Sequence, residues 1–300
     1  GCYGCNGGAR PGTLEPTTGC GAARRPYHTL LTSSSGTYQL WQSRVMHHHF
    51  RLQRSRDPCG EMGGFTRLHT MRDGVADQYG DELHTVTVNE VYGGYPVVNR
   101  PSSIVQFVEQ GHLDRIEEDY IFIAETDHIF LRPVPNLATE KVPAAFHFGY
   151  MVAAGQANIV EKFVPGLGGK TDPIGPSPLI IHKEQLRRVA RPWLEFTRKI
   201  CSDREVRTST QRRAEPRRNP RPGPTRIAAL ARPQAVQALG WVREMWGYAI
   251  AAASLGIRHL VLDAFQFEVR TLLTRSSLCA ALTWWLRTLP HAARPPTSMC

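Results

Sequence analysis

The sequence lacks an apolar run long enough to cross a bilayer. Such a span needs about 18–20 predominantly apolar residues. The best candidate, Leu278 to Leu289, is shorter than that and contains Arg287. Because the chain begins at Gly1 rather than Met, we expect a fragment whose N-terminal signal or anchor lies outside it.

A zinc-binding arrangement of cysteines is also lacking. The seven cysteines are odd in number and widely spread, and Cys2-x-x-Cys5 has no second pair at zinc-ligand spacing. A structural zinc site is therefore not expected. One or two disulfides, formed in an oxidising compartment, stay open as an alternative.

Acidic residues are scarce relative to basic ones, and the imbalance is local. The chain carries a net charge of +10, but nine arginines and two glutamates between Arg204 and Arg232 account for seven of those charges. The rest of the chain is close to neutral, so the sequence gives little support to a nucleic-acid-binding fold. This Arg/Pro-rich stretch, bounded at 203–237, is predicted to be a disordered insertion.

Apolar periodicity predicts alternating strands and helices, and hence an α/β fold with a mainly parallel sheet. Residues 1–25, which are Gly-rich and aperiodic, are predicted to be disordered, residues 26–262 to form the main domain, and 263–300 to be a tail without a clear pattern. Pro192 should kink or split the helix over 183–200. The loop 172–178 is predicted to be rich in turns. The expected strands are 27–32, 63–68, 83–88, 120–124, 144–148, 179–181 and 258–262, and the expected helices are 37–53, one from Asn99 to Gly111, 183–200 and 238–255.

The triplet Glu125-Thr126-Asp127 is the main candidate site. It follows the uninterrupted apolar run Ile121-Phe122-Ile123-Ala124, which is typical of a central strand covered on both faces. Ligands of open α/β sheets bind at the carboxyl ends of strands. Two carboxylates there suit a hard divalent cation, which can neutralise a diphosphate leaving group. A polar turn that caps the strand is an equally probable interpretation of the triplet alone.

Two single residues and one run of histidines are further candidates. Glu244 lies in an otherwise apolar helix, and a buried carboxylate is paired or functional. An ion pair with Arg243 or with an arginine of the insertion competes with a catalytic role. His259 is a candidate metal ligand, although a lone histidine that precedes a strand is more often structural. His47-His48-His49 is interpreted as a solvated helix surface.

Several short segments together resemble one family, the peptidyl hydroxyproline O-arabinosyltransferases of plants and green algae, which are related to peptidyl serine galactosyltransferases. The segments occur in the family's order and cover about 27–202 and 238–262. The matching segments are 27–32, 38–46, 62–67, Val98-Asn99-Arg100-Pro101, Glu125-Thr126-Asp127-His128-Ile129-Phe130, 133–138, Asp172-Pro173-Ile174-Gly175 and Gly240-Trp241-Val242-Arg243-Glu244-Met245 with Tyr248-Ala249.

The resemblance implies a GT-A-like, Rossmann-like domain that binds a nucleotide sugar. It also implies a Golgi type II membrane protein that transfers L-arabinofuranose from UDP-arabinofuranose to hydroxyproline of secreted or wall proteins, with retention of configuration. Thr32, Glu125 and Asp127 would bind the donor, while Asp127, Glu125 and His259 would hold Mn²⁺ or Mg²⁺. Glu244 would orient the acceptor hydroxyl or stabilise the oxocarbenium-like sugar.

Two alternatives to arabinosyl transfer stay open. One is a peptidyl serine galactosyltransferase, and the other is an inactive relative that binds a glycan or a peptide. The chain departs from the family pattern at Pro176, where Asn is expected, and at His147 and Gly149, which replace aromatic residues. The insertion also interrupts the connection before Gly240.

Overall fold

The computed structural model describes Cys20 and residues 25–72, 74, 77, 79, 82–92, 95–203 and 235–266. The chain divides into two units, Glu15–Leu262 and a second one of Gly1–Leu14 with Asp263–Cys300. Of the second unit the structure describes 263–266, in which Asp263–Phe265 form a short 3₁₀ helix. The predictions for 1–25, apart from Cys20 and Arg25, and for the tail after 266 lie outside the described residues.

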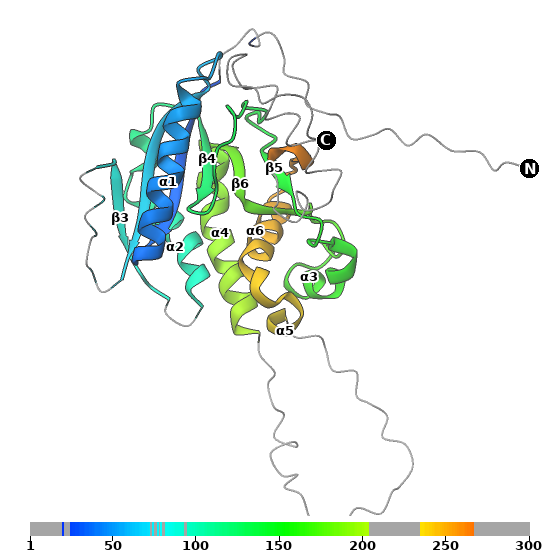
Figure 1. Ribbon diagram of the computed structural model, residues 1–300. Helices are drawn as coiled ribbons and strands as arrows, with labels where there is room; N and C mark the ends of the chain where they lie inside the picture. Colours follow the sequence, from blue (N-terminus) through cyan, green and yellow to red (C-terminus); the bar gives the residue numbers. More distant parts are fainter. Residues whose placement is uncertain are drawn as a thin grey trace, which may run out of the picture. The chain divides into compact units, whose positions relative to one another are not determined.

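A seven-stranded sheet forms the centre of this unit, with strand order β3-β2-β1-β4-β6-β5-β7 (Figure 1). Strands β1, β2, β3 and β4 pair in parallel, as do β5 and β7, and only β6 runs antiparallel to its neighbours. The α/β fold with a mainly parallel sheet is therefore confirmed. The strands are β1 (Tyr27–Ser34), β2 (Met62–Met71), β3 (Thr85–Asn89), β4 (Tyr120–Glu125), β5 (Ala144–His147), β6 (Ile174–His182) and β7 (Leu260–Leu262).

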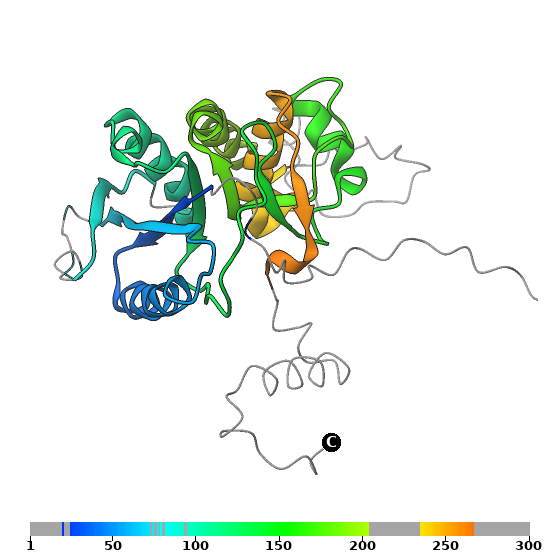
Figure 2. The same ribbon diagram turned by 90° about the horizontal axis from the view of Figure 1, so that it is seen from above.

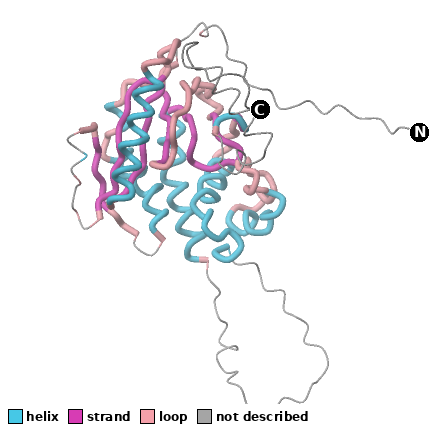
Figure 3. Tube along the Cα trace, in the orientation of Figure 1, coloured by secondary structure: helices cyan, strands magenta, loops and turns pink. Residues whose placement is uncertain are grey.

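Helices cover both faces of the sheet. Helix α1 lies on one face, and α2, α4 and α6 lie together on the other, as the view from above shows (Figure 2). Figure 3 shows the chain in the orientation of Figure 1, with helices in cyan and strands in magenta. The helices are α1 (Thr37–Arg54), α2 (Asn99–Glu109), α3 (Ala157–Phe163), α4 (Lys183–Ser202), α5 (Ala235–Leu239) and α6 (Arg243–Ser254).

Strand β4 is central because every residue of its apolar run is buried. Ile121 and Ile123 point to one face and Phe122 and Ala124 to the other, and none is more than 4% exposed. A strand buried on both faces needs helices on both sides, which α1 and the α2–α4–α6 layer provide. Glu125, the last residue of β4, and the polar residues that follow it therefore lie at the carboxyl end of this central strand.

The predicted loop 172–178 is wrong, because β6 already begins at Ile174. Two prolines of the predicted loop, Pro176 and Pro178, lie inside β6. Its pairing with β5 is irregular at this point, between the pairs His147↔Ile174 and Ala145↔Leu179. A proline has no N–H to donate to the ladder, so a break in register accommodates Pro176 and Pro178 within a strand. Helix α4 runs unbroken over Lys183–Ser202 with Pro192 inside, so the predicted split does not occur.

The predicted helix 238–255 is divided in two. Gly240 has φ +51°, and a 3₁₀ turn, η6 (Gly240–Val242), separates α5 from α6. Few residues other than glycine adopt this left-handed conformation readily. Trp241, expected on the buried helix, is 72% exposed as a result.

The predicted insertion 203–237 is also too long at its C-terminal end, because α5 begins at Ala235. Residues 204–234 lie outside the described residues. The two residues that flank them are in contact, since the Ala235 amide donates a hydrogen bond to Asp203 Oδ2 at 2.9 Å. Lys162 forms an ion pair with the other oxygen of Asp203.

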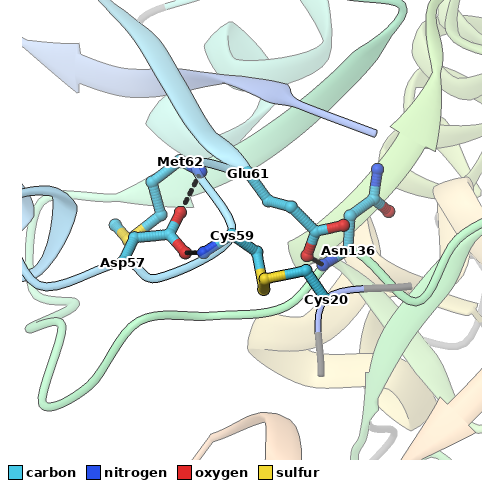
Figure 4. Close-up of a disulfide and its surroundings, with 6 residues drawn as sticks. All are labelled: Cys20, Asp57, Cys59, Glu61, Met62 and Asn136. Atoms are coloured by element: carbon cyan, nitrogen blue, oxygen red, sulfur yellow. Dashed lines mark hydrogen bonds between the residues drawn. A yellow bond between two sulfur atoms is a disulfide. The ribbon is translucent and has the colours of Figure 1, made fainter. Parts of the chain in front are cut away.

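A disulfide joins Cys20 to Cys59, so one of the pairings that the sequence left open is present (Figure 4). The loop around Cys59 is held by Asp57, which accepts hydrogen bonds from the amides of Cys59 at 3.0 Å and Met62 at 2.7 Å. The disulfide therefore ties the chain ahead of β1 to the loop that precedes β2. Across the parts of the chain that the structure describes, no helix has the length and apolarity of a membrane span.

Candidate active site

The carboxyl ends of β1 and β4 lie side by side, and Thr32 of β1 is opposite Glu125 of β4. The Thr32 hydroxyl donates a hydrogen bond to the Ala124 carbonyl at 3.1 Å, and Thr32 is 8% exposed. The structure thus brings two of the predicted donor-binding residues together. The hydroxyl proton of Thr32 is used within the sheet, which leaves its oxygen as an acceptor.

A tight turn follows β4 and turns Asp127 outward. The Glu125 amide donates to His128 Nδ1 at 3.3 Å, and the His128 amide donates to the Glu125 carbonyl at 3.1 Å. Thr126 is buried and its hydroxyl lies within hydrogen-bond distance of Gln39 Oε1, at 3.1 Å, and Gln42 Oε1, at 3.0 Å, both on α1. The buried threonine therefore anchors the turn.

Asp127 itself is exposed, and its carboxylate has no hydrogen-bond partner among the described residues. A carboxylate that is free in this way, at the edge where the strands end, can bind a cation or a hydroxyl group.

Arg100 connects the predicted residues into one cluster. Its guanidinium lies 2.5 Å from Glu125 Oε2 and 3.1 Å from Glu244 Oε2. The three residues come from the first turn of α2, the end of β4 and the first turn of α6. Arg100 is thus a partner of Glu244 that was not predicted, and the competing arginines of the insertion lie outside the described residues. Arg243 instead stacks its guanidinium over the Tyr95 ring.

The single positive charge of Arg100 cannot neutralise the carboxylates of both Glu125 and Glu244. The remaining negative charge disfavours ionisation of Glu244. Its side chain is 1% exposed. Burial raises the pKa of Glu244 to about 7, with Arg100 opposing the rise and the Glu125 charge adding to it. Burial alone would lower the pKa of Arg100, but the carboxylates of Glu125 and Glu244 raise it.

One oxygen of Glu244 lacks a partner. Oε1 is buried, and no hydrogen bond reaches it from the described residues. An unpaired buried acceptor costs about 1–3 kcal/mol unless its group is protonated or it meets a ligand. The cluster therefore holds a carboxyl group that is poised to exchange a proton near neutral pH.

His259 does not join this cluster. Its Nδ1 lies 3.1 Å from Asp172 Oδ2 and its Nε2 lies 3.0 Å from the Tyr248 hydroxyl, so both ring nitrogens have protein partners. The side chain is 1% exposed. Among the described residues, no three His, Cys, Asp or Glu side chains are grouped as a metal site would require. The structure therefore gives His259 a structural position and does not bring it to Asp127 and Glu125.

The histidine run on α1 is mixed rather than fully solvated. His48 is exposed, but His47 is partly buried, with its Nδ1 3.1 Å from the Tyr79 hydroxyl. Desolvation lowers the pKa of His47. It contributes to packing between α1 and the strands.

Arg100 is the site residue that sequence reasoning missed. It belongs to Val98-Asn99-Arg100-Pro101, a segment that predicts the start of a helix and matches the family but does not by itself indicate a role for the arginine. The signal that could have found it is the charge of Glu244, since a carboxylate in an apolar helix requires a cationic partner.

Comparison with known proteins identifies the family of this chain. A sequence model of the hydroxyproline O-arabinosyltransferase family N-terminal domain matches residues 27–211 and 225–261. Hydroxyproline O-arabinosyltransferase RDN2 of Medicago truncatula is 37% identical over 253 residues, which are 82% of this chain and 61% of that protein. Hydroxyproline O-arabinosyltransferase 3 of Arabidopsis thaliana is 36% identical, over 81% of this chain and 60% of that protein.

Two more distant proteins also match. A peptidyl serine alpha-galactosyltransferase of Arabidopsis thaliana is 25% identical over 78% of this chain and 26% of its own length. Among solved structures, mouse xyloside xylosyltransferase 1 in its apo form matches with a TM-score of 0.38 and 10% identity, over 79% of this chain and 85% of that one.

The match to the family model includes β4, α2 and α6, the elements that carry the cluster, and β1, which carries Thr32. The chain spans about six tenths of the length of the two curated arabinosyltransferases compared above. On the family match and these identities, the chain belongs to the hydroxyproline O-arabinosyltransferase family.

Proposed function

We propose that this chain transfers an arabinofuranosyl group from UDP-arabinofuranose to the hydroxyl of hydroxyproline in a secreted protein or peptide, with retention of configuration. Family membership supports the reaction. The observation that carries the site is the ion-paired cluster of Glu125, Arg100 and Glu244 beside the free carboxylate of Asp127. In this proposal the sheet is the GT-A-like nucleotide-sugar-binding domain.

A divalent cation, Mn²⁺ or Mg²⁺, fits this site through Asp127. The Asp127 carboxylate is exposed and unpaired among the described residues, which suits a hard cation with oxygen ligands. Glu125 is already bound by Arg100, so it contacts the cation less readily than Asp127 does. The cation would neutralise the charge that develops on the diphosphate. The residues supply orientation, since Thr126 fixes the turn and Arg100 fixes the Glu125 carboxylate.

Glu244 acts in this proposal through Arg100. Because it is 1% exposed and its Oε2 lies on Arg100, it positions the guanidinium rather than touching the sugar. A rigid Arg100 holds Glu125 where the donor ribose or sugar hydroxyls can bind. Orientation of this kind contributes strongly to catalysis.

The test is transfer of a pentose to a hydroxyproline-rich peptide, with UDP-arabinofuranose and Mn²⁺, followed by mass spectrometry of the peptide. We expect Asp127→Asn to lower kcat/KM by about 10²–10³, as the loss of one electrostatic contact to a transition state does. Asp114→Asn is the matched control, because Asp114 is an exposed aspartate in the η3 turn (Leu113–Arg115), ahead of β4, at the other end of that strand. It should stay within twofold of the unsubstituted chain.

The outcomes separate the alternatives. Equal pentose transfer by Asp127→Asn sinks the assigned site. Transfer of hexose from UDP-galactose to a serine-rich peptide, with none from UDP-arabinofuranose, establishes the galactosyltransferase alternative instead. Peptide binding with no transfer from either donor establishes an inactive relative.

The compartment is part of the same proposal. We propose the Golgi lumen, and the Cys20–Cys59 disulfide supports an oxidising compartment of this kind. Thiol alkylation of protein from the native source, followed by peptide mass mapping, checks it. Alkylation of both cysteines without prior reduction would contradict this placement.

A further inference from the structure

Two exposed aromatic side chains lie next to each other beside the cluster. Trp241 is 72% exposed and Tyr150 is 47% exposed, and their ring centroids are 6.0 Å apart. A single exposed aromatic residue is common on protein surfaces, whereas an adjacent pair presents a larger apolar face to solvent. We call Tyr150 and Trp241 the aromatic surface.

The local fold fixes the aromatic surface in place. The left-handed Gly240 turns the chain out of helix α5, so that Trp241 projects into solvent. The Tyr95 hydroxyl donates a hydrogen bond to the Trp241 carbonyl at 2.5 Å, and the Arg243 guanidinium covers the Tyr95 ring at 3.9 Å. The Tyr150 hydroxyl lies 3.7 Å from Met245 Sδ. Rings held in this way lose little entropy when a ligand binds.

Tyr95 and the η6 turn link the aromatic surface to the elements that carry the charged cluster. Trp241 lies in η6 and precedes Glu244 by three residues, while Tyr95, whose hydroxyl holds the Trp241 carbonyl, precedes Arg100 by five. The Glu244 carboxylate is close enough to add to the effect of burial on the Tyr95 pKa, which rises to about 12. The exposed rings are therefore attached to the same short segments that position Arg100 and Glu244.

The chemistry of these rings matches a proline-rich chain. Proline-rich segments adopt the extended polyproline II helix, which has a preformed shape and no internal hydrogen bonds. Such segments dock on surfaces lined with Tyr and Trp, where pyrrolidine rings pack on the aromatic faces. The indole N–H of an exposed Trp is free to meet a peptide carbonyl of the bound chain.

We propose that Tyr150 and Trp241 form the docking surface for the acceptor, a hydroxyproline-rich peptide in the polyproline II conformation. The proposal rests on the proposed function, since it names the substrate-binding surface of that same site. The surface holds the peptide segment next to the reacting hydroxyproline, while the cluster serves the donor sugar. Docking and transfer are therefore separable by experiment.

The experiment measures binding of a fluorescently labelled hydroxyproline-rich peptide to the full chain by anisotropy, with no sugar donor present. We expect Trp241→Ala to raise the Kd at least tenfold, Tyr150→Ala to raise it several-fold, and Trp241→Phe to stay within threefold. Because Trp241 is exposed, the alanine variant should keep its Tm, and this is checked in parallel.

Trp41→Ala is the matched control. Trp41 is 49% exposed on α1 and stacks edge-on with Tyr38, so it tests whether any exposed tryptophan has the same effect. It should change the peptide Kd by less than twofold. A serine-rich peptide without proline or hydroxyproline should bind at least tenfold more weakly.

Three results overturn the docking surface: no detectable peptide binding, an unchanged Kd in Trp241→Ala, or an equal loss in Trp41→Ala. Displacement of the peptide by a free arabino-oligosaccharide at lower concentration than by unlabelled peptide assigns these rings to a glycan instead. Trp241-dependent binding without any pentose transfer overturns the proposed function and leaves the docking surface standing. Pentose transfer by Trp241→Ala with an unchanged KM for the acceptor peptide overturns the docking surface and leaves the proposed function standing.

Discussion

Glu244→Gln should change how the stability of the protein depends on pH. The folded state raises the Glu244 pKa from an ordinary 4.5 to about 7, chiefly through burial. Below pH 4.5 the carboxyl group is protonated in both the folded and the unfolded chain, so it contributes nothing. Between the two pKa values the unfolded chain gives up the proton and the folded chain keeps it, so the free energy of unfolding falls as pH rises.

The magnitude follows from the gap between the two pKa values. Each pH unit corresponds to about 1.4 kcal/mol, so the gap amounts to roughly 3 kcal/mol of stability, lost between pH 4.5 and 7 and constant above that. Glutamine keeps the shape and an oxygen acceptor for Arg100 but has no proton to lose. The stability advantage of Glu244→Gln over the unsubstituted chain should therefore grow by roughly 3 kcal/mol across this range.

The assay is urea unfolding of both proteins at half-unit steps from pH 4.5 to 8, followed by tryptophan fluorescence. Only the difference between the two proteins is used, because other groups titrate in the same range. Desolvation lowers the pKa of His69 to about 4, for example, and that group is common to both. Glu140→Gln, at an exposed position, gives the baseline for replacing a surface glutamate. A difference that stays flat within about 0.5 kcal/mol, against this expectation of roughly 3, would refute the account of Glu244 as a buried carboxyl of raised pKa.

Three further outcomes are expected. Cys59→Ser removes a disulfide that closes a 39-residue separation and should lower stability by about 2–4 kcal/mol in non-reducing urea unfolding, with no change once a reductant is added. Gly247→Ala should lower Tm, because the new methyl group would lie 2.1 Å from Thr197 Oγ1 and 2.9 Å from its backbone nitrogen; an unchanged Tm would contradict this packing. Glu118→Gln should lose its destabilising effect as pH falls from 5 to 2, since the hydrogen bond from His28 and two backbone amides hold the Glu118 pKa at about 2, and acid titration of both proteins by circular dichroism checks it.

The sheet was predictable where burial decides local structure. The run from Ile121 to Ala124 is apolar without a break because both faces of β4 are covered, so its sequence alone identifies a central strand. The prolines of β6 misled for the opposite reason. Whether a strand tolerates Pro176 depends on the register of its neighbour, and that register is a property of the whole sheet.

The site was predictable only in part, because its partners are distant in sequence. Glu125 and Asp127 stand out as a polar triplet after a strand, whereas Arg100 lies 25 residues before one of its partners and 144 before the other. Apolar periodicity describes residues within one helix or strand, so it does not indicate a contact between residues that are this far apart in the sequence. For His259 the sequence shows a titratable side chain, but it cannot show that Asp172 and Tyr248 lie within hydrogen-bond distance of its two ring nitrogens.

The hydrogen bond between Ala235 and Asp203 has a consequence for how this family can vary. It holds Asp203, which follows α4, against Ala235, which begins α5, so the two helices meet at the same point whatever the length of the chain between them. The entropy of closing a flexible connection grows only slowly with its length, by about 0.6 kcal/mol for each doubling. Insertions and deletions at this one place are therefore nearly neutral for the fold, and they leave Arg100, Glu125 and Glu244 where they are. Length variation among relatives should concentrate there, and the gap in the family match at 212–224 falls within it.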